Sequence, residues 1–401
     1  MRFGPVRVVS PGSPWHGKVV YVELTERGIE TITPAAGEPQ AQLSPGWIDI
    51  TAWTWQPQVP SAESLLSLAK RAQRGGFSQI LVGGWHGWSE PAFLAQIRAE
   101  ASDLPVQLHF IAAWADADGN IAPVESLRLE GAVAWALPPL EPISWKTFAK
   151  VLPYLRYLGG VVFALPFWEG AGGEMGVPEA TELALAGWEG IPPYAETVAV
   201  HAIAALHRAH GAHVVVGPLT TAEGLQLIQE YGLAGFTGIS YLAAHAEELL
   251  TYDPVWKLHP PLRQKADQAS LREAVYERNL LVASWDIDPP AEDKHKEWLS
   301  AAVGQPTLEQ AAPLLWTILR ERVDVWEASE LLVYILSEKP RHLLGIGPSA
   351  LQEGFPLDFT VFRQGELRVL PHPWERYRSD LEVLGTIRCL ADAYSLQNQI
   401  A

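Results

Sequence analysis

Eight short apolar segments, each followed by a stretch with helical spacing, constrain the fold of this chain more than any other feature. In chain order they read WIDITAW, QILVGG, QLHFIAA, GAVAWAL, VVFALPF, HVVVGPL, FTGISYL and LLVASWD. Continuous apolar runs of this length are typical of parallel strands that are buried on both faces. Eight strand-then-helix units in succession predict a (β/α)8 TIM-like barrel more economically than an open doubly wound sheet.

The segments between these runs carry helix signals. Ser61 can cap a helix that contains Leu65, Leu66, Leu68 and Ala69, and the pair Gly75 and Gly76 can end it. Residues 196–210, 222–231 and 271–278 also have helical apolar spacing, and a longer helical region covers about 308–336.

Both ends of the chain return to strand-like alternation. Residues 6–33 alternate around a Gly-Ser-Pro turn, and the segment LDFTVF and residues 366–370 alternate near the other end. We therefore expect the ends to pair as a small β-sandwich domain made of residues 1–46 and 347–401. Residues 47–346 would form the barrel.

Charge and cysteine content limit the classes of function. The net charge of -17 arises from 46 acidic and 29 basic residues, which argues against binding nucleic acid or an anionic membrane through bulk electrostatics. The single cysteine, Cys389, cannot form an intramolecular disulfide. The sequence has no run of about 18 uncharged apolar residues. We therefore expect a cytoplasmic protein.

Seven segments, spread in order over most of the chain, resemble the dihydroorotases, which are cyclic amidohydrolases. They are SPGWIDITAW, RAQRGGFSQILVGG, GIPPYAETVAV, LTTAEGLQLI, YDPVWKLHPPLRQKAD, SEKPRHLLGI and LDFTVF. Each segment is weak evidence alone, but their order and spacing together support the family resemblance.

The resemblance implies a binuclear zinc site at the carboxyl ends of the barrel strands, with an aspartate that shuttles a proton. Histidine and carboxylate groups are the zinc ligands of such sites. In this sequence the His-x-His pair of the family falls on Thr51 and Trp53. The remaining metal and substrate positions fall on Trp55, Trp85, Leu137 or Pro138, Leu165 to Trp168, Pro218, Ala243, Ala244 and His259. The resemblance thus implies that the zinc site is lost and that the chain carries no metal or other cofactor.

Two polar residues of the family pattern are retained. Asp286 occupies the position of the proton-shuttling aspartate, and His245 that of a histidine that usually binds no metal. Asp286 is our candidate for a vestigial catalytic residue, although a carboxylate at a strand end more often caps a loop or pairs with a base. His86, His245 and His259 could form a relocated metal site, and Arg263 could bind a carboxylate, but we favour separate side chains and a loop anchor.

Tryptophans replace much of the lost site. Trp53, Trp55, Trp85, Trp88, Trp168 and Trp285 all fall at or next to strand ends. We expect them to fill the barrel mouth, because each buried ring removes a large apolar area from water. The alternative is an aromatic pocket, with Trp53, Trp55, Trp85, His245, His259 and Arg263 as its candidate residues.

Three hypotheses of function follow from the resemblance. The leading one is a non-catalytic structural or regulatory subunit in pyrimidine biosynthesis, with aspartate carbamoyltransferase or an active dihydroorotase as partner, and a homodimer as its own state. The second is a hydrolase of the cyclic amidohydrolase type with a rearranged site. The third is a small-molecule sensor. The chain has no Gly-x-Ser-x-Gly, Walker-type or His-Glu-x-x-His motif that would indicate another kind of active site.

Overall fold

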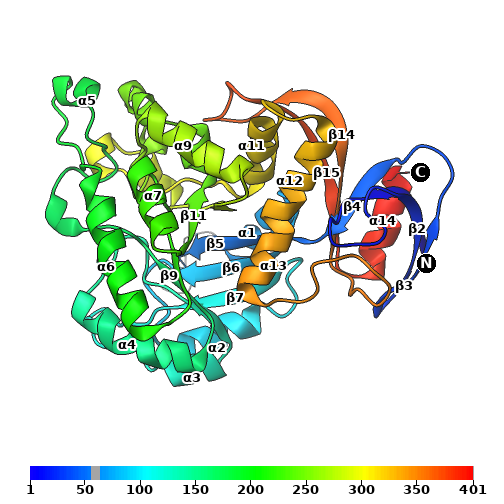
Figure 1. Ribbon diagram of the computed structural model, residues 1–401, viewed down its shortest axis with the longest axis horizontal. Coiled ribbons are helices and arrows are strands. Elements are labelled where there is room, and N and C mark those ends of the chain that lie inside the picture. The colour runs from blue at the N-terminus through cyan, green and yellow to red at the C-terminus, as the bar shows by residue number, and fades with distance from the viewer. Residues whose placement is uncertain (56–63, 401) are drawn as a thin grey trace.

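The computed structural model describes residues 1–55 and 64–400, which form a barrel with a smaller sheet beside it (Figure 1). Within this part of the chain, the barrel sheet has the strand order β12-β11-β10-β9-β8-β7-β6-β5-β13, and all of its pairs are parallel. Its strands are β5 (Trp47–Thr54), β6 (Phe77–Gly84), β7 (Gln107–Ala112), β8 (Ala132–Trp135), β9 (Val161–Ala164), β10 (Val214–Val216), β11 (Ala234–Gly238), β12 (Leu281–Ala283) and β13 (Asp286–Ile287).

The barrel closes through an interrupted eighth strand. β12 pairs with β11 and β13 pairs with β5, and only Ser284 and Trp285 separate the two strands along the chain. Trp285 has a φ of 53°, a left-handed conformation that a strand cannot continue through. The predicted TIM-like barrel is confirmed, with LLVASWD divided between two short strands.

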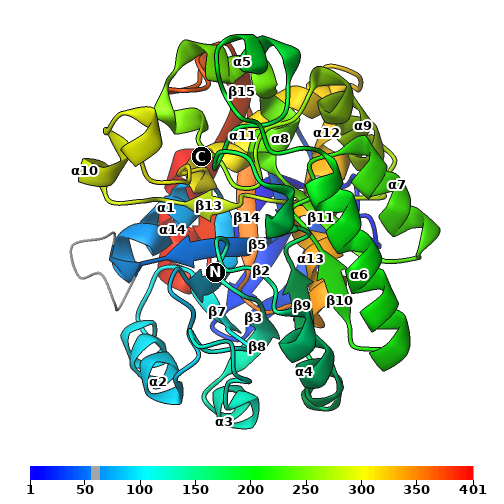
Figure 2. The ribbon, with the colours of Figure 1, turned by 90° about the vertical axis from the view of Figure 1, so that its left-hand side faces the viewer.

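Helices surround the barrel strands (Figure 2). They are α1 (Leu65–Arg74), α2 (Pro91–Glu100), α3 (Val124–Leu129), α4 (Trp145–Leu158), α5 (Thr181–Leu185), α6 (Tyr194–His210), α7 (Ala222–Glu230), α8 (Ile239–Ala243), α9 (Lys265–Tyr276), α10 (Ala291–Lys294), α11 (Leu308–Arg320), α12 (Val325–Val333) and α13 (Lys339–Leu344). Shorter turns are η1 (Glu169–Ala171), η2 (Ala246–Thr251), η3 (Pro254–Trp256) and η4 (Trp298–Ser300), and the π-helical η5 (Tyr334–Glu338) joins α12 to α13.

Two details differ from the sequence predictions. The segment FTGISYL is not one strand, because β11 ends at Gly238 and α8 begins at the next residue. Ser61, which we expected to cap the first barrel helix, lies outside the described residues. Ser64 caps α1 instead, and its side chain accepts a hydrogen bond from the backbone N–H of Ser67.

The smaller sheet joins the two ends of the chain, as predicted. Its order is β15-β14-β4-β1-β2-β3, and its pairs are antiparallel except for β1 with β4. The strands are β1 (Arg2–Val8), β2 (Val19–Thr25), β3 (Gly28–Pro34), β4 (Ala41–Pro45), β14 (Phe359–Val369) and β15 (Arg378–Ile387). The last helix, α14 (Leu390–Ile400), buries Ala393, Leu396 and Ile400 in a second apolar core, which it shares with this sheet.

None of the described helices combines the length and the apolar character needed to cross a bilayer.

Candidate functional site

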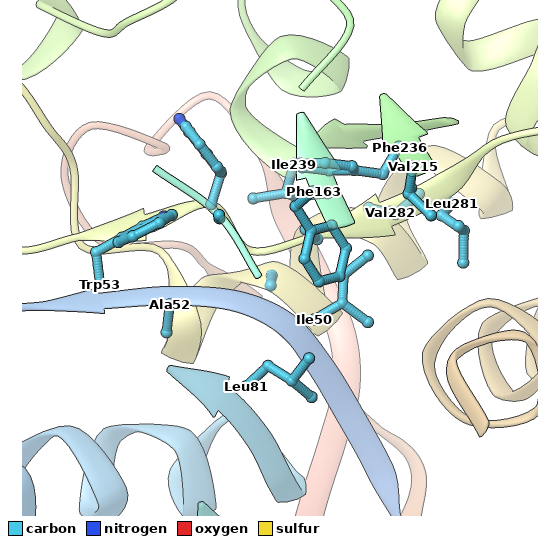
Figure 3. Close-up of a cluster of buried hydrophobic side chains, with 14 of the residues drawn as sticks. Ile50, Ala52, Trp53, Leu81, Phe163, Val215, Phe236, Ile239, Leu281 and Val282 are labelled. Atoms are coloured by element: carbon cyan, nitrogen blue, oxygen red, sulfur yellow. The ribbon is translucent and has the colours of Figure 1, made fainter. Parts of the chain in front are cut away.

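A series of aromatic rings joins four barrel strands near the level where a catalytic site is expected. The ring of Trp53, on β5, meets Trp285 edge-on at 6.1 Å between centroids, and Trp285 lies 6.0 Å from Phe236 on β11. Phe236 in turn meets Phe163 of β9 edge-on at 5.8 Å. Trp53, Phe163 and Phe236 lie within one cluster of buried side chains (Figure 3). Edge-on ring pairs at these separations add to the stabilisation that comes from burial alone.

A second aromatic group lies at the ends of β5 and β6. Trp55 and Trp85 pack at 4.4 Å with an interplanar angle of 31°, and the exposed His86 meets Trp55 edge-on at 5.8 Å. Trp88 is fully buried against Phe110. Trp85 and Trp88 are buried and Trp55 is partly buried, just beyond the ends of β5 and β6.

Trp168 is the exception, and the expectation that it fills the mouth is wrong. Its side chain is 37% exposed, and its ring packs beside Tyr194 on α6. The turn η1 begins directly after Trp168, which places this residue at the rim.

His259 lies under the mouth and contacts the aromatic rings. Its side chain is 2% exposed and meets Phe167 edge-on at 4.4 Å, and its backbone oxygen accepts a hydrogen bond of 3.0 Å from Trp285 Nε1. Burial, and to a lesser degree the charge of Arg263, lower the pKa of His259 to about 3. The imidazole is therefore neutral at physiological pH. Its Nδ1 atom has no hydrogen-bond partner among the described residues.

Arg263 is buried and holds neighbouring loops. Its Nη1 donates to the backbone oxygen of Ile191 at 2.5 Å, and its Nε donates to Thr220 Oγ1 at 3.3 Å. Thr220 also donates, from N and Oγ1, to the buried carboxylate of Glu196. Burial lowers the pKa of Arg263 and raises that of Glu196. The opposite charge of each residue partly offsets the pKa shift of the other. The half-buried His245 precedes η2, whose first residue, Ala246, donates its N–H to the backbone oxygen of Arg263.

Asp286 has both carboxylate oxygens engaged. They accept hydrogen bonds from Arg71 Nη1 at 3.0 Å and Nη2 at 2.7 Å. The backbone N–H groups of Thr307 and Leu308 also donate to Oδ1, at 2.5 and 2.9 Å. Asp286 is fully buried, and these contacts connect the eighth strand to α1 and to the beginning of α11. The arrangement is that of a buried ion pair combined with a helix cap.

A second buried aspartate stands beside it. Asp49 on β5 accepts hydrogen bonds from Ser284 N at 2.7 Å and from Ser284 Oγ at 2.6 Å, which ties the first strand to the interruption of the eighth. Burial raises the pKa of Asp49 to about 7, despite these hydrogen bonds. Sequence reasoning did not single out Asp49, Arg71 or Glu196. An acidic residue inside the apolar run WIDITAW was the available signal for Asp49, since a buried carboxylate requires partners.

The side chains that are present do not fit a binuclear zinc site. In the described part of the chain, no group of three or more His, Cys, Asp or Glu side chains is placed to hold a metal ion. The positions that the resemblance assigns to the His-x-His pair carry Thr51 and Trp53, and neither side chain supplies the imidazole or carboxylate donors that zinc takes in such sites.

A cavity of about 460 Å³ opens beside the aromatic mouth. It is formed by the loops that follow β6, β7, β8 and β9, and it includes His86, Trp114, Asp118, Glu141 and Glu169. A smaller cavity of about 110 Å³ shares Glu141 and Glu169 with it and reaches Phe167 and His259. Ligand sites of TIM barrels lie at this end of the strands.

Comparison with known proteins gives dihydroorotases among the similar relatives. A dihydroorotase from Pelotomaculum thermopropionicum is 27% identical over 330 residues, which cover 79% of this chain and 76% of that protein. A dihydroorotase from Thermus aquaticus is 28% identical over 376 residues, which cover 84% of each chain. No protein-family model matches the sequence. The family resemblance indicated by the sequence motifs is confirmed.

Solved structures agree on the fold. The L-hydantoinase (dihydropyrimidinase) from Arthrobacter aurescens superposes with a TM-score of 0.82 at 17% identity, over 96% of this chain and 94% of that chain. A dihydroorotase from Saccharomyces cerevisiae, crystallised with 5-fluoroorotic acid, gives a TM-score of 0.65 at 12% identity, over 84% of this chain and 97% of that one. At these identities the likeness supports the shared architecture.

Proposed function

Because this chain is a dihydroorotase-like member of the amidohydrolase superfamily, we propose that it is a non-catalytic subunit that acts through protein contacts in pyrimidine biosynthesis. The observation that carries the proposal is the composition of the barrel mouth. Trp53, Trp55 and Trp85 occupy positions that the family resemblance assigns to metal and substrate, and the first two rings pack against Trp285 and Trp85.

The chemistry of hydrolysis supports this proposal. Attack on a cyclic amide at neutral pH needs an activated water, and zinc would supply one by lowering the pKa of the bound water. Indole rings and the hydroxyl of Thr51 do not replace such a metal. Asp286 could accept a proton only by weakening its contacts with Arg71 and two backbone amides.

Metal content and hydrolysis test the loss of catalysis. The protein is purified without chelator, its zinc is measured by elemental analysis, and dihydroorotate hydrolysis is assayed with and without added zinc. We expect sub-stoichiometric zinc and no hydrolysis above the rate without protein. One or two tightly held metal ions per chain, together with turnover, would contradict the proposal and favour a rearranged hydrolase around His86, His245 and Asp286.

The partner we propose is aspartate carbamoyltransferase or an active dihydroorotase, with the chain itself as a cytoplasmic homodimer. The partner from the same organism is co-expressed with the tagged chain, and the complex is sought by pull-down and size-exclusion chromatography. We expect co-elution at a mass above that of either protein. Elution of the isolated chain alone, from co-expression and from native extract, would count against a role through protein contacts.

A further inference from the structure

Exposed apolar side chains gather on three barrel loops that contact one another. These loops follow β9, β11 and β13 and contain α5, η2 and η4, so they lie at the mouth end of the barrel. α5 packs beside η2 and lies at the end of the molecule far from both termini (Figure 1). The exposed apolar side chains of these loops, which we call the apolar patch, are Leu185, Leu250, Tyr252 and Leu299.

The half-buried Trp188 connects the three loops. Its ring packs on Tyr252 at 5.8 Å between centroids and meets the buried Trp298 edge-on at 5.3 Å. Trp298 is followed in η4 by Leu299, and the backbone N–H of Trp188 donates to the backbone oxygen of Leu183 in α5. These contacts bring the patch residues of the three loops onto one surface.

The backbone that carries the patch is fixed in place. Lys257 Nζ donates to the backbone oxygens of Trp298 and Leu299, at 2.7 and 3.2 Å. Tyr252 has a φ of 58°, a left-handed conformation that non-glycine residues keep only where the surrounding structure imposes it. Leu185 and Leu299 are nevertheless 85% and 77% exposed. A single exposed leucine is ordinary, whereas apolar side chains that gather on one ordered surface mark a site of contact with another molecule.

The charged side chains beside the patch are mainly acidic. Four exposed carboxylates, which we call the acidic rim, lie in the same loops: Glu182 on α5, Glu189 beside Trp188, Glu247 on η2 and Glu297 directly before η4. In the described part of the chain, none of the four forms an ion pair. Lys296, which also lies next to η4, is already paired with Asp293 at 2.6 Å. The rim therefore attracts a basic surface and repels an acidic one.

We propose that the apolar patch docks a protein whose own surface carries lysine and arginine side chains around an apolar centre. This inference rests on the proposed function, a role through protein contacts, and assigns that role a surface. A second copy of this chain does not fit the patch, because a twofold interface would place the acidic rims of the two copies against each other. An anionic membrane is disfavoured for the same electrostatic reason.

Affinities of patch and control variants test this surface. The probes are purified aspartate carbamoyltransferase and active dihydroorotase from the same organism, measured against the full chain by biolayer interferometry. Leu185→Ser/Leu299→Ser removes the two most exposed patch side chains and should weaken binding about tenfold, mainly through faster dissociation. The matched control Leu129→Ser/Leu367→Ser changes two leucines on α3 and β14 that are also well exposed, and it should bind as the wild type does. Both variants should keep the wild-type melting temperature.

Charge reversal tests the acidic rim. Glu182→Lys/Glu189→Lys should slow association about tenfold at low ionic strength and make the association rate less dependent on salt. The matched control is Glu30→Lys/Glu38→Lys, which reverses two exposed charges in the region of the smaller sheet. Equal slowing by both charge variants would mean that the net charge of the chain, and not the rim, attracts the partner, and would overturn the assignment of the rim.

The possible results separate this surface from the proposed role. Equal binding by Leu185→Ser/Leu299→Ser and by its control would overturn the docking surface and leave the subunit role in place. If the patch variant changed the self-association of the chain in size-exclusion chromatography, the occupant would be a second copy and the inference would be wrong. Binding of neither probe by the wild-type chain would overturn both the docking surface and the proposed role. Zinc-dependent hydrolysis would overturn only the proposed lack of catalysis, and selective loss of binding in the patch variant would still support the docking surface.

Discussion

Replacing Asp286 by asparagine should destabilise the protein strongly, whatever its effect on chemistry. The substituted amide would keep an oxygen for the N–H groups of Thr307 and Leu308 but would present no charge to Arg71. Neutralising one partner of a buried ion pair costs about 3–5 kcal/mol. The Arg71 side chain retains 11% exposure and can be partly hydrated, so we expect the lower end, about 3 kcal/mol. For a chain of 401 residues that unfolds as one unit, this corresponds to a melting temperature about 4 °C lower, measurable by calorimetry.

Two further variants make the test specific. Glu273→Gln breaks the ion pair with Arg322, in which both side chains are about half exposed, and it should leave the melting temperature unchanged. Combining Arg71→Met with Asp286→Asn removes both buried charges, so the double variant should lose less stability than the sum of the single variants. Wild-type melting of Asp286→Asn, or strict additivity in the double variant, would refute the assignment of Asp286 as an anchor between the eighth strand, α1 and α11.

Two other substitutions test the barrel interior. Burial raises the pKa of Asp49 from 3.8 to about 7, so the folded state binds a proton that the unfolded chain releases, and the free energy of unfolding falls as pH rises through that interval. As the pH rises from 5 to 8, the free energy of unfolding of Asp49→Asn should therefore increase by about 3 kcal/mol relative to that of the wild type, measured by chemical denaturation. A difference between the two proteins that stays constant with pH would contradict this. Trp53→Ala should cost about 3–5 kcal/mol, because the ring is 4% exposed and packs on Trp285; a loss below about 1 kcal/mol in the same assay would mean that the mouth is not filled by this ring.

The strands were predictable from the sequence because buried parallel strands leave continuous apolar runs between helices. That signal located every barrel segment, including the eighth, which is interrupted at Trp285. It could not show the interruption, since Trp285 has a positive φ there and contacts His259 and Phe236, which belong to other segments of the chain. The change from β11 to α8 was missed for a related reason: Ile239 and Leu242 are buried and apolar in a helix as they would be in a strand.

The candidate site was predictable only at positions that the resemblance supplied. It assigned the family's His-x-His positions to Thr51 and Trp53, because strand-end positions can be matched segment by segment, and this assignment stays a prediction. It could not supply the partners of Asp286, because Arg71 lies 215 residues away on α1 and its own segment carries no signal of this pairing. The ion pair and the helix cap give Asp286 a structural role that requires no metal-bound water. Its removal would take away the carboxylate 2.7 Å from Arg71 Nη2 and the cap of α11, and would leave Arg71 with Asp288 at 3.7 Å. A carboxylate at the position that the resemblance gives to the proton-shuttling aspartate is therefore compatible with a barrel mouth in which the described residues form no group of metal ligands.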